Sequence, residues 1–236
     1  MNEPLVLLPG MMCDARIFAP QIFALSTDMA VMTAPITGGE RIEEIASQIL
    51  SLAPAKFALA GLSMGGIVAL EIVRRAPERI TRLALMDTSP LAETPQEAAA
   101  REPQIVGARA GRMLEVIRDQ MLPHVLRQGP DRMAQQALML DMAADLGTEV
   151  FVRQTRALQR RRDHQMTLRK IRQPVLILCG AEDRLTPPKR HEFMAQLIEF
   201  AQLRVIEGAG HFPVLDQPSA VTCAIRDWMK QPLVLR

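Results

Sequence analysis

Short apolar runs alternate along the chain with longer segments in which apolar residues recur every three or four positions. A run without polar residues is typical of a strand that is buried on both faces of a parallel sheet. Runs that are wholly or mainly apolar predict strands at residues 5–8, 29–33, 57–60, 80–86, 175–179 and 203–206. The spaced patterns predict helices at residues 15–25, 40–52, 67–76, 186–200 and 218–229. We therefore expect the α/β class, with a doubly wound, mostly parallel sheet of about six strands and right-handed crossovers.

This alternation stops between the fourth and fifth predicted strands. Residues 88–170 contain no convincing strand, and their patterns predict helices that include 131–146 and 148–162. Residues 94–97 have the form of a capping box with proline in the first helical turn. We expect two domains: an α/β core at 1–87 and 171–236, and a helical cap at 88–170. The insertion either adds packing to the core or covers a ligand site as a lid, and its place after the end of a strand favours the lid.

Composition excludes some classes of function. The formal net charge is +2, which gives no indication of a nucleic-acid or membrane partner. No apolar run approaches the roughly 18 residues that span a bilayer, and no leader pattern opens the sequence. Three widely spaced cysteines, Cys13, Cys179 and Cys223, are typical of reduced thiols in a cytoplasmic protein. No pair of them has zinc-ligand spacing, and neither a metal nor an organic cofactor is expected.

The stretch 56–66, KFALAGLSMGG, carries the first candidate for chemistry. It contains a Gly-x-Ser-x-Gly pattern centred on Ser63, with a predicted strand before it and a predicted helix after it. This context is that of a nucleophile elbow, in which the serine has a strained backbone and Gly61 and Gly65 permit close packing. The alternative is a glycine-rich turn with an incidental serine. A histidine and an aspartate in suitable places favour the nucleophile.

Those two partners are Asp183 and His211, each of which follows a predicted strand as Ser63 does. Parallel strands end at one edge of a sheet, so the three side chains are expected to converge as a Ser–His–Asp triad. Asp87 also follows a strand and is the alternative acid, but it fits equally well in a turn that closes the strand. The other candidates have structural interpretations: His124, His164 and His191 at the surface, and Asp216 as the cap of the last helix.

Four stretches taken together resemble the α/β-hydrolase superfamily along nearly the whole chain: LVLLPG, GLSMGG, VLILCGAEDRLTP and IEGAGHFPVLDQP. The most similar members are small capped carboxylesterases, enol-lactonases and C–C bond hydrolases. The resemblance implies a triad of Ser63, Asp183 and His211. It also implies an oxyanion hole made by the backbone N–H groups of Met11 and Met64. The first turn lacks the histidine that the family usually has before its glycine, a difference that leaves the backbone donors in place.

Two residues outside the triad are candidates for substrate binding. On a wheel of about 100° per residue, Arg162 falls on the apolar side of its predicted helix. There it either bends to water or pairs with a carboxylate of the substrate. Cys13 is close to the first turn and either lines the pocket or packs beside it.

The function expected from these residues is hydrolysis of a small or medium carboxylic ester or lactone through an acyl-enzyme on Ser63. Two alternatives stay open, because a fold does not determine a function. The same triad serves C–C bond hydrolases and lyases, and a non-catalytic member would sense a ligand or bind a partner. The natural substrate, the motion of the lid and the oligomeric state are open as well.

Overall fold

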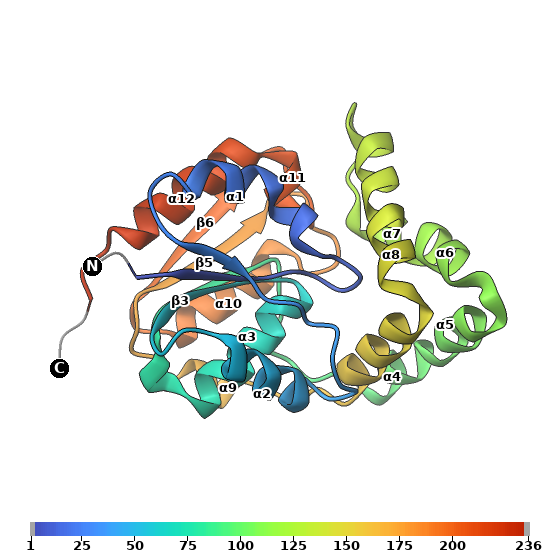
Figure 1. Ribbon diagram of the computed structural model, residues 1–236, viewed down its shortest axis with the longest axis horizontal. Coiled ribbons are helices and arrows are strands. Elements are labelled where there is room, and N and C mark those ends of the chain that lie inside the picture. Colours follow the sequence, from blue (N-terminus) through green and yellow to red (C-terminus); the bar gives the residue numbers. More distant parts are fainter. Residues whose placement is uncertain (1–2, 234–236) are drawn as a thin grey trace.

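The computed structural model describes residues 3–233, and its centre is a sheet of six strands in the order β2-β1-β3-β4-β5-β6 (Figure 1). The strands are β1 Leu5–Leu8, β2 Val31–Thr33, β3 Phe57–Leu62, β4 Ile80–Met86, β5 Val175–Gly180 and β6 Ala201–Ile206. Every neighbouring pair is parallel. All six predicted strands are present, which confirms the α/β class. β2 begins later than predicted because its pairing with β1 starts at Val31.

Alternate residues of each strand point to opposite faces of the sheet, and this divides the core in two. Leu5 and Leu7 belong to the core of one face, whereas Val6 and Leu8 belong to that of the other. The first face is covered by the 3-10 helix Ala15–Phe18 and by α1 Ala19–Leu25, α11 Pro213–Asp216 and α12 Pro218–Met229. The second is covered by α2 Ile42–Leu52, α3 Met64–Arg75, α9 Gln165–Leu168 and α10 Pro188–Leu197. Figure 1 shows these two helical layers on either side of the strands.

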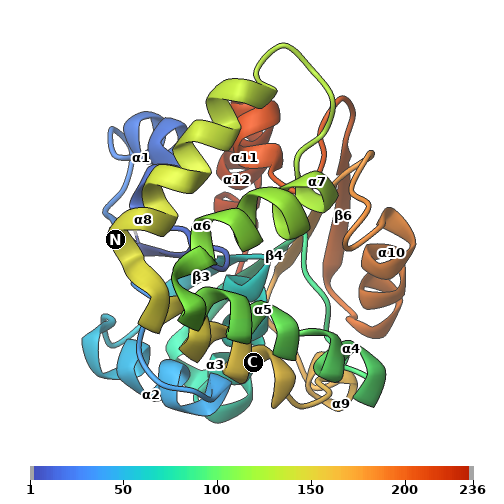
Figure 2. The same cartoon turned by 90° about the vertical axis from the view of Figure 1, so that its right-hand side faces the viewer.

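Apart from α9, the helices between β4 and β5 form a group to one side of the sheet, and Figure 2 looks onto this cap with α8 crossing it. Its helices are α4 Pro95–Ala100, α5 Glu102–Gly107, α6 Met113–Val116, α7 Leu122–Val125 and α8 Arg132–Gln159. The π-helical segments Ala108–Arg112 and Ile117–Met121 connect α5, α6 and α7. Within residues 3–233, no helix has the length and hydrophobicity needed to cross a membrane.

Local signals in the cap are mostly confirmed. The backbone N–H of Glu97 donates to Thr94 Oγ1 over 3.2 Å, and Glu97 Oε2 accepts from the N–H of Thr94 over 2.7 Å, so the capping box is formed. The two predicted long helices are the halves of α8, which breaks at Gly147 with φ 80 and ψ 170. A positive φ of this size favours glycine. The second half ends at Gln159, earlier than predicted.

The inner face of the cap continues the core of the sheet. Met139 and Met142 of α8 are 4% and 0% exposed and pack on the turn that follows β1. The Cys13 thiol lies 4.0 Å from Met139 Sδ, and the backbone N–H of Asp14 lies 3.5 Å from Met142 Sδ. The polarisable thioethers of methionine fill such irregular gaps well. The cap therefore packs directly on the turn after β1.

Candidate active site

Ser63 lies in the turn between β3 and α3, with its backbone at φ 54 and ψ −116. This conformation is costly for a residue with a Cβ and persists only where the surroundings enforce it. A Cβ on Gly61 would lie 2.3 Å from the carbonyl oxygen of Gly65, and one on Gly65 would lie 2.2 Å from that of Leu8. Both positions of the Gly-x-Ser-x-Gly pattern therefore require glycine because backbone passes directly against them.

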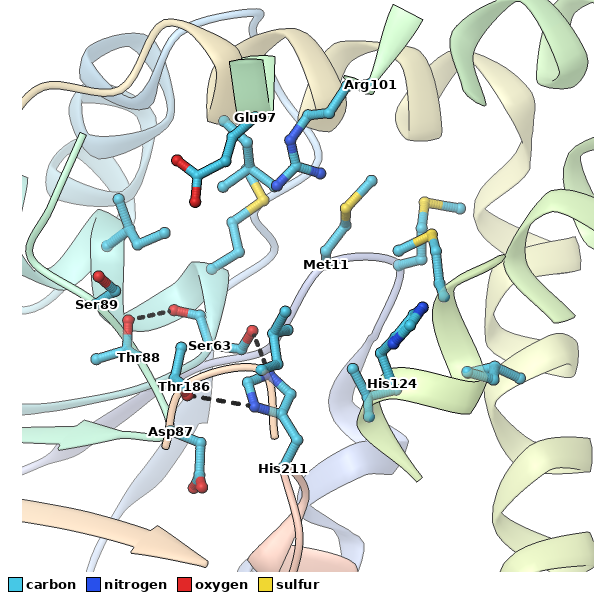
Figure 3. Close-up of a pocket in the computed structure, with 18 of the residues that line it drawn as sticks. Met11, Ser63, Asp87, Thr88, Ser89, Glu97, Arg101, His124, Thr186 and His211 are labelled. Atoms are coloured by element: carbon cyan, nitrogen blue, oxygen red, sulfur yellow. Dashed lines mark hydrogen bonds between the residues drawn. The ribbon is translucent and has the colours of Figure 1, made fainter. Parts of the chain in front are cut away.

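Three side chains meet at the carboxyl edge of the sheet. Ser63 Oγ lies 2.9 Å from His211 Nε2, and His211 Nδ1 lies 2.8 Å from Asp183 Oδ2. Ser63 follows β3, Asp183 follows β5 and His211 follows β6, so the order of the strands brings together residues up to 148 positions apart. Figure 3 shows the Ser63 hydroxyl facing the ring of His211. The structure thus places the three predicted residues in one hydrogen-bonded chain.

Asp183 is held as a carboxylate. Burial alone would raise its pKa, but hydrogen bonds from His211 and Thr186 outweigh that effect and lower the pKa to about 2. Its Oδ2 accepts from the Thr186 hydroxyl over 2.6 Å, and its Oδ1 accepts from the N–H groups of Leu185 and Thr186. A fixed carboxylate keeps the ring hydrogen on Nδ1, which leaves Nε2 to accept from Ser63. This arrangement can remove a proton from a serine hydroxyl.

Asp87, the alternative acid, lies behind the same site, but its hydrogen bonds and its pKa differ from those of Asp183. Its Oδ1 accepts from the backbone N–H of Gly180 over 2.9 Å, and its Oδ2 has no partner in the part of the chain that the structure describes. Burial, and then the charge of Asp183, raise the pKa of Asp87 well above its usual value. The Asp87 carboxyl therefore ionises less readily than that of Asp183, and the carboxylate that faces His211 is Asp183.

Asp87, Asp183 and His211 also form the one group within residues 3–233 whose potential metal-ligating atoms lie within 4.8 Å of one another. Hydrogen bonds already occupy both ring nitrogens of His211 and both carboxylate oxygens of Asp183. An ion at this place would have to displace the bond between these two residues. The cluster fits a proton-transfer network better than a metal centre.

Two backbone N–H groups border the Ser63 hydroxyl. Met64 is the first residue of α3, where an N–H has no partner within the helix, and Met11 belongs to the turn after β1. Neither N–H has an acceptor among the residues that the structure describes. The two segments approach closely, since a Cβ on Gly10 would lie 3.5 Å from Ser63 Cβ. Two free donors beside a nucleophile can stabilise an oxyanion.

Gln154 of α8 fixes the turn that carries Met11. The residue is fully buried, its Oε1 accepts from the N–H of Met12 over 2.8 Å, and its Nε2 donates to the carbonyl oxygen of Ile36 over 3.1 Å. Met12 has φ 53, which is uncommon for a residue other than glycine, so the bond restrains a strained turn. Nothing in the sequence pattern distinguishes Gln154 from other polar residues of its helix, and it was not predicted.

His191 supports the elbow from behind, and its predicted surface position is wrong. It is 0% exposed, its Nε2 accepts from the N–H of Thr88 over 3.0 Å, and the Thr88 hydroxyl donates to the carbonyl oxygen of Ser63 over 2.7 Å. Nε2 can accept only while it carries no proton, so the ring must be neutral. Burial lowers the pKa of His191 to about 4.

Because His191 takes up a proton more readily in the unfolded chain, its titration should destabilise the protein in acid. We expect the free energy of unfolding to be lower by up to about 2 kcal/mol at about pH 5 than at about pH 7.5. Because its pKa is lower in the folded chain, the stabilisation is complete above the ordinary value of 6.5 and is lost as the pH falls toward 4. His191→Gln offers an acceptor that does not titrate. Urea unfolding at the two pH values should show a smaller fall in this variant than in wild type. An equal fall in both would contradict the assignment.

Ser63 and His211 open into a cavity of about 450 Å³ beneath the cap. Part of its lining is apolar and comes mainly from the cap: Met11, Ile117, Met121, Leu122, Met139 and Phe212. The rest includes a group of charged side chains: Glu93, Glu97, Arg101, Arg161 and Arg190. Figure 3 shows Glu97 and Arg101 at the end of the cavity away from His211. The cavity therefore has both an apolar and a charged part.

Neither predicted substrate-binding residue lines this cavity. Arg162 is exposed, pairs with Glu43 over 3.1 Å and borders a separate depression. Its predicted position assumed a helix that continues to residue 162, but α8 ends at Gln159. The neighbouring Arg161 lines the cavity instead. Cys13 is 1% exposed and packs beside the first turn, where burial raises the pKa of its thiol. Both predictions are corrected by the structure.

Two structural interpretations are also corrected. His164 is 1% exposed, and burial lowers its pKa to about 4. Asp216 does not cap the last helix, because its Oδ2 accepts from the N–H of Gly210 and its Oδ1 from the side-chain amide of Gln135, each over 2.8 Å. It therefore joins the cap to the turn at Gly210. His124 is exposed, as predicted, and lines the cavity.

Comparison with known proteins identifies a matching family and several similar proteins. Residues 5–225 match the model of the Alpha/beta hydrolase family. The pimeloyl-acyl-carrier-protein methyl ester esterase of Aromatoleum aromaticum is 29% identical over 96% of this chain and 98% of its own. The protein of the same name from Neisseria meningitidis is 28% identical over 84% of this chain and 78% of its own.

Solved structures show the same fold. A thermophilic esterase from Thermogutta terrifontis, with malate bound, has a TM-score of 0.88 and 27% identity, and the match covers 98% of this chain and 90% of that one. The enol-lactonase from Burkholderia xenovorans has a TM-score of 0.84 at 24% identity, covering 98% of this chain and 93% of that one. The family match spans both parts of the sheet and the helices between them. The chain therefore belongs to the alpha/beta hydrolase family.

Proposed function

We propose that the protein is a serine carboxylesterase that cleaves small or medium esters through an acyl-enzyme. Ser63 Oγ attacks the carbonyl carbon of the ester while His211 Nε2 takes the hydroxyl proton. Asp183 holds the ring and stabilises the positive charge that it gains. The carbonyl oxygen becomes an oxyanion, which accepts hydrogen bonds from the N–H groups of Met11 and Met64.

The second half of the cycle uses the same groups. The ring of His211 gives its proton to the departing alkoxide, which leaves as the alcohol while the acyl group stays on Ser63. A water molecule then gives a proton to Nε2 and attacks the acyl carbon. Collapse of this intermediate releases the carboxylic acid and returns the proton to Ser63. Every proton transfer in the cycle is made at one ring nitrogen.

The cavity and the relatives support the kind of substrate. Methionine, isoleucine and leucine in the lining suit an acyl chain of small or medium length. The relatives from Aromatoleum and Neisseria are named methyl ester esterases, and the Thermogutta structure is that of an esterase. These names support an ester with a small alcohol, such as methanol, as the leaving group. A lactone contains the same acyl–oxygen bond and stays within the proposal.

One observation carries the proposal: the hydrogen-bonded chain from Ser63 through His211 to Asp183, open to a cavity of about 450 Å³. The test is hydrolysis of methyl and p-nitrophenyl esters by the wild-type protein, from acetate to laurate. We expect turnover with an optimum at a short or medium acyl chain. A folded protein that hydrolyses none of the series would overturn the proposal and favour C–C bond cleavage by the same triad.

Replacing Gln154 with leucine is expected to lower kcat for ester hydrolysis by about 10- to 100-fold and to leave KM within a few-fold. The substitution removes the acceptor that holds the N–H of Met12. The strained turn can then relax, which moves the N–H of Met11 away from the oxyanion. The cavity still binds the ester, because Gln154 does not line it. Steady-state kinetics on one p-nitrophenyl ester give both constants.

Gln159→Leu is the matched control for this prediction. Gln159 lies on the same helix, but its amide donates to Ala98 and Glu102 within the cap and does not touch the turn after β1. Thermal melting of both variants checks that they are folded. An equal loss of kcat in the two variants, or a rise in KM with unchanged kcat in Gln154→Leu, would contradict the role of Gln154.

A further inference from the structure

Three arginines from separate segments converge on the cavity beside Ser63. Arg101 follows α4, Arg161 follows α8 and Arg190 lies in α10. The side chains of Arg101 and Arg161 are 23% and 13% exposed, so most of each is removed from solvent. Burial of a guanidinium group is costly unless carboxylates compensate its charge. The carboxylates near these arginines therefore show how much of their positive charge is compensated within the cavity.

Two carboxylates face these three cations. The side chain of Glu93 is 2% exposed, accepts three hydrogen bonds from Arg101 and lies 3.2 Å from Arg161. Glu97 also lines the cavity, but its Oε2 is engaged by the N–H and hydroxyl of Thr94 in the capping box. This cluster of five side chains thus has three guanidinium groups and two carboxylates, an excess of one positive charge.

Within the described part of the chain, some N–H groups of the three guanidinium groups also have no hydrogen-bond acceptor. Among the described residues, no acceptor is paired with Nη1 of Arg101, with Nη2 of Arg161 or with Nη2 of Arg190. Within residues 3–233, the one hydrogen-bond partner of the Arg190 guanidinium is the hydroxyl of Ser89, over 2.9 Å. Burial, and then the charges of Arg101 and Arg190, lower the pKa of Arg161 against the opposing effect of Glu93. An anion in the cavity would use these donors and relieve the crowding of charge.

We propose that Arg101, Arg161 and Arg190 form a subsite for a carboxylate of the substrate, so that the protein prefers esters bearing a second, free carboxylate over neutral esters. This inference rests on the esterase function proposed above. A carboxylate matches the fork of N–H groups that a guanidinium presents and would neutralise the excess charge. The apolar part of the cavity receives the carbon chain between the carboxylate and the ester bond. Pairing with a substrate carboxylate, one of the two alternatives considered for Arg162, is thus proposed for Arg161 instead.

The test compares charged and neutral esters of equal length. On the acid side of the bond, the pairs are the monomethyl and dimethyl esters of glutaric, adipic and pimelic acids. On the alcohol side, they are acetoxy carboxylic acids and their methyl esters. We expect kcat/KM to favour the charged member by about 10-fold or more in one of the two arms. That arm identifies the side of the ester that enters the arginine cluster.

Substitutions then locate the subsite. Arg161→Gln and Arg190→Gln should each reduce the charged-to-neutral ratio about 10-fold, because kcat/KM falls more for the charged ester than for the neutral one. Arg162→Gln is the matched control, because that side chain is exposed and outside the cavity, and the ratio should not change. Glu93→Gln should raise the ratio, since it removes a compensating charge. A purely structural network predicts equal losses for both esters and an unchanged ratio in Glu93→Gln.

Binding to the Ser63→Ala variant separates this inference from the esterase proposal. Calorimetry with the same ester pairs measures affinity without hydrolysis, and the charged member should bind about 10-fold more tightly. Arg161→Gln in the same background should remove the difference. If no ester is hydrolysed but this difference is found, the esterase function fails and the carboxylate subsite stands. Equal affinity for charged and neutral members in both arms overturns the subsite.

Discussion

Replacing Ser63 with alanine is expected to lower kcat for ester hydrolysis by roughly 10⁶-fold, the largest effect of any single substitution in this protein. The variant has no oxygen to form the acyl-enzyme, so water must attack the ester directly. The N–H groups of Met11 and Met64 and the cavity are unchanged, which leaves a small residual acceleration. Hydrolysis of a p-nitrophenyl ester at saturating substrate measures the loss over the background rate.

The stability of this variant should stay close to that of wild type. The one side-chain partner of the Ser63 hydroxyl among the described residues is His211, and alanine keeps the backbone in the same strained region. Thermal melting of the two proteins makes the comparison. If a folded Ser63→Ala protein retained more than about one hundredth of wild-type kcat, Ser63 would not be the nucleophile.

Replacing Asp183 with asparagine is expected to reduce kcat by about 10⁴-fold. Asparagine can present an N–H to His211 Nδ1, which favours the ring tautomer with its hydrogen on Nε2. Nε2 is then unable to accept the proton of Ser63, and the imidazolium loses the charge that stabilises it. Since the pKa of Asp183 is about 2, the wild-type carboxylate is ionised throughout the range in which esters are assayed. The loss should therefore be similar at every pH from neutral to weakly acidic.

Asp87→Asn is the matched control for Asp183→Asn. The same chemical change is made a few ångströms away, on a carboxyl that does not face His211 and whose pKa is raised well above its usual value by burial. Asparagine keeps the acceptor for the N–H of Gly180, so activity should change by only a few-fold. A larger loss in Asp87→Asn than in Asp183→Asn would mean that the acid of the triad had been assigned to the wrong residue.

The order of strands and helices could be predicted because each of these elements has its own hydrophobic period. β1 and β5 are buried on both faces and contain only apolar residues apart from the glycine that ends β5, which is a strong local signal. The Ser63 elbow was equally predictable from its Gly-x-Ser-x-Gly pattern, although only Gly61 is required by a contact within a few residues and Gly65 is required by the backbone of Leu8. Asp183 and His211 followed from their place at strand ends. Parallel strands bring such positions to one edge without further information.

Residues that act across the interface of cap and core could not be predicted in this way. Gln154 reaches a turn 142 positions away, and its role depends on the orientation of one helix relative to that turn. Arg162 was misplaced because a helical wheel was continued past the end of α8 at Gln159. His191 was misplaced because a histidine in an amphipathic helix has the same pattern whether it faces water or a backbone N–H. Each of these depends on tertiary contacts.

The most direct test of the central claim is covalent labelling with diethyl p-nitrophenyl phosphate. This reagent transfers its phosphoryl group to an activated serine and releases p-nitrophenolate, which is counted by absorbance, while peptide mass spectrometry locates the label. The triad geometry predicts one nitrophenolate per chain, a label on Ser63, slower labelling in Asp183→Asn and none in Ser63→Ala. A folded wild-type protein that stays unlabelled at Ser63, or that carries the label on another residue, would contradict the claim that Ser63 is an activated nucleophile.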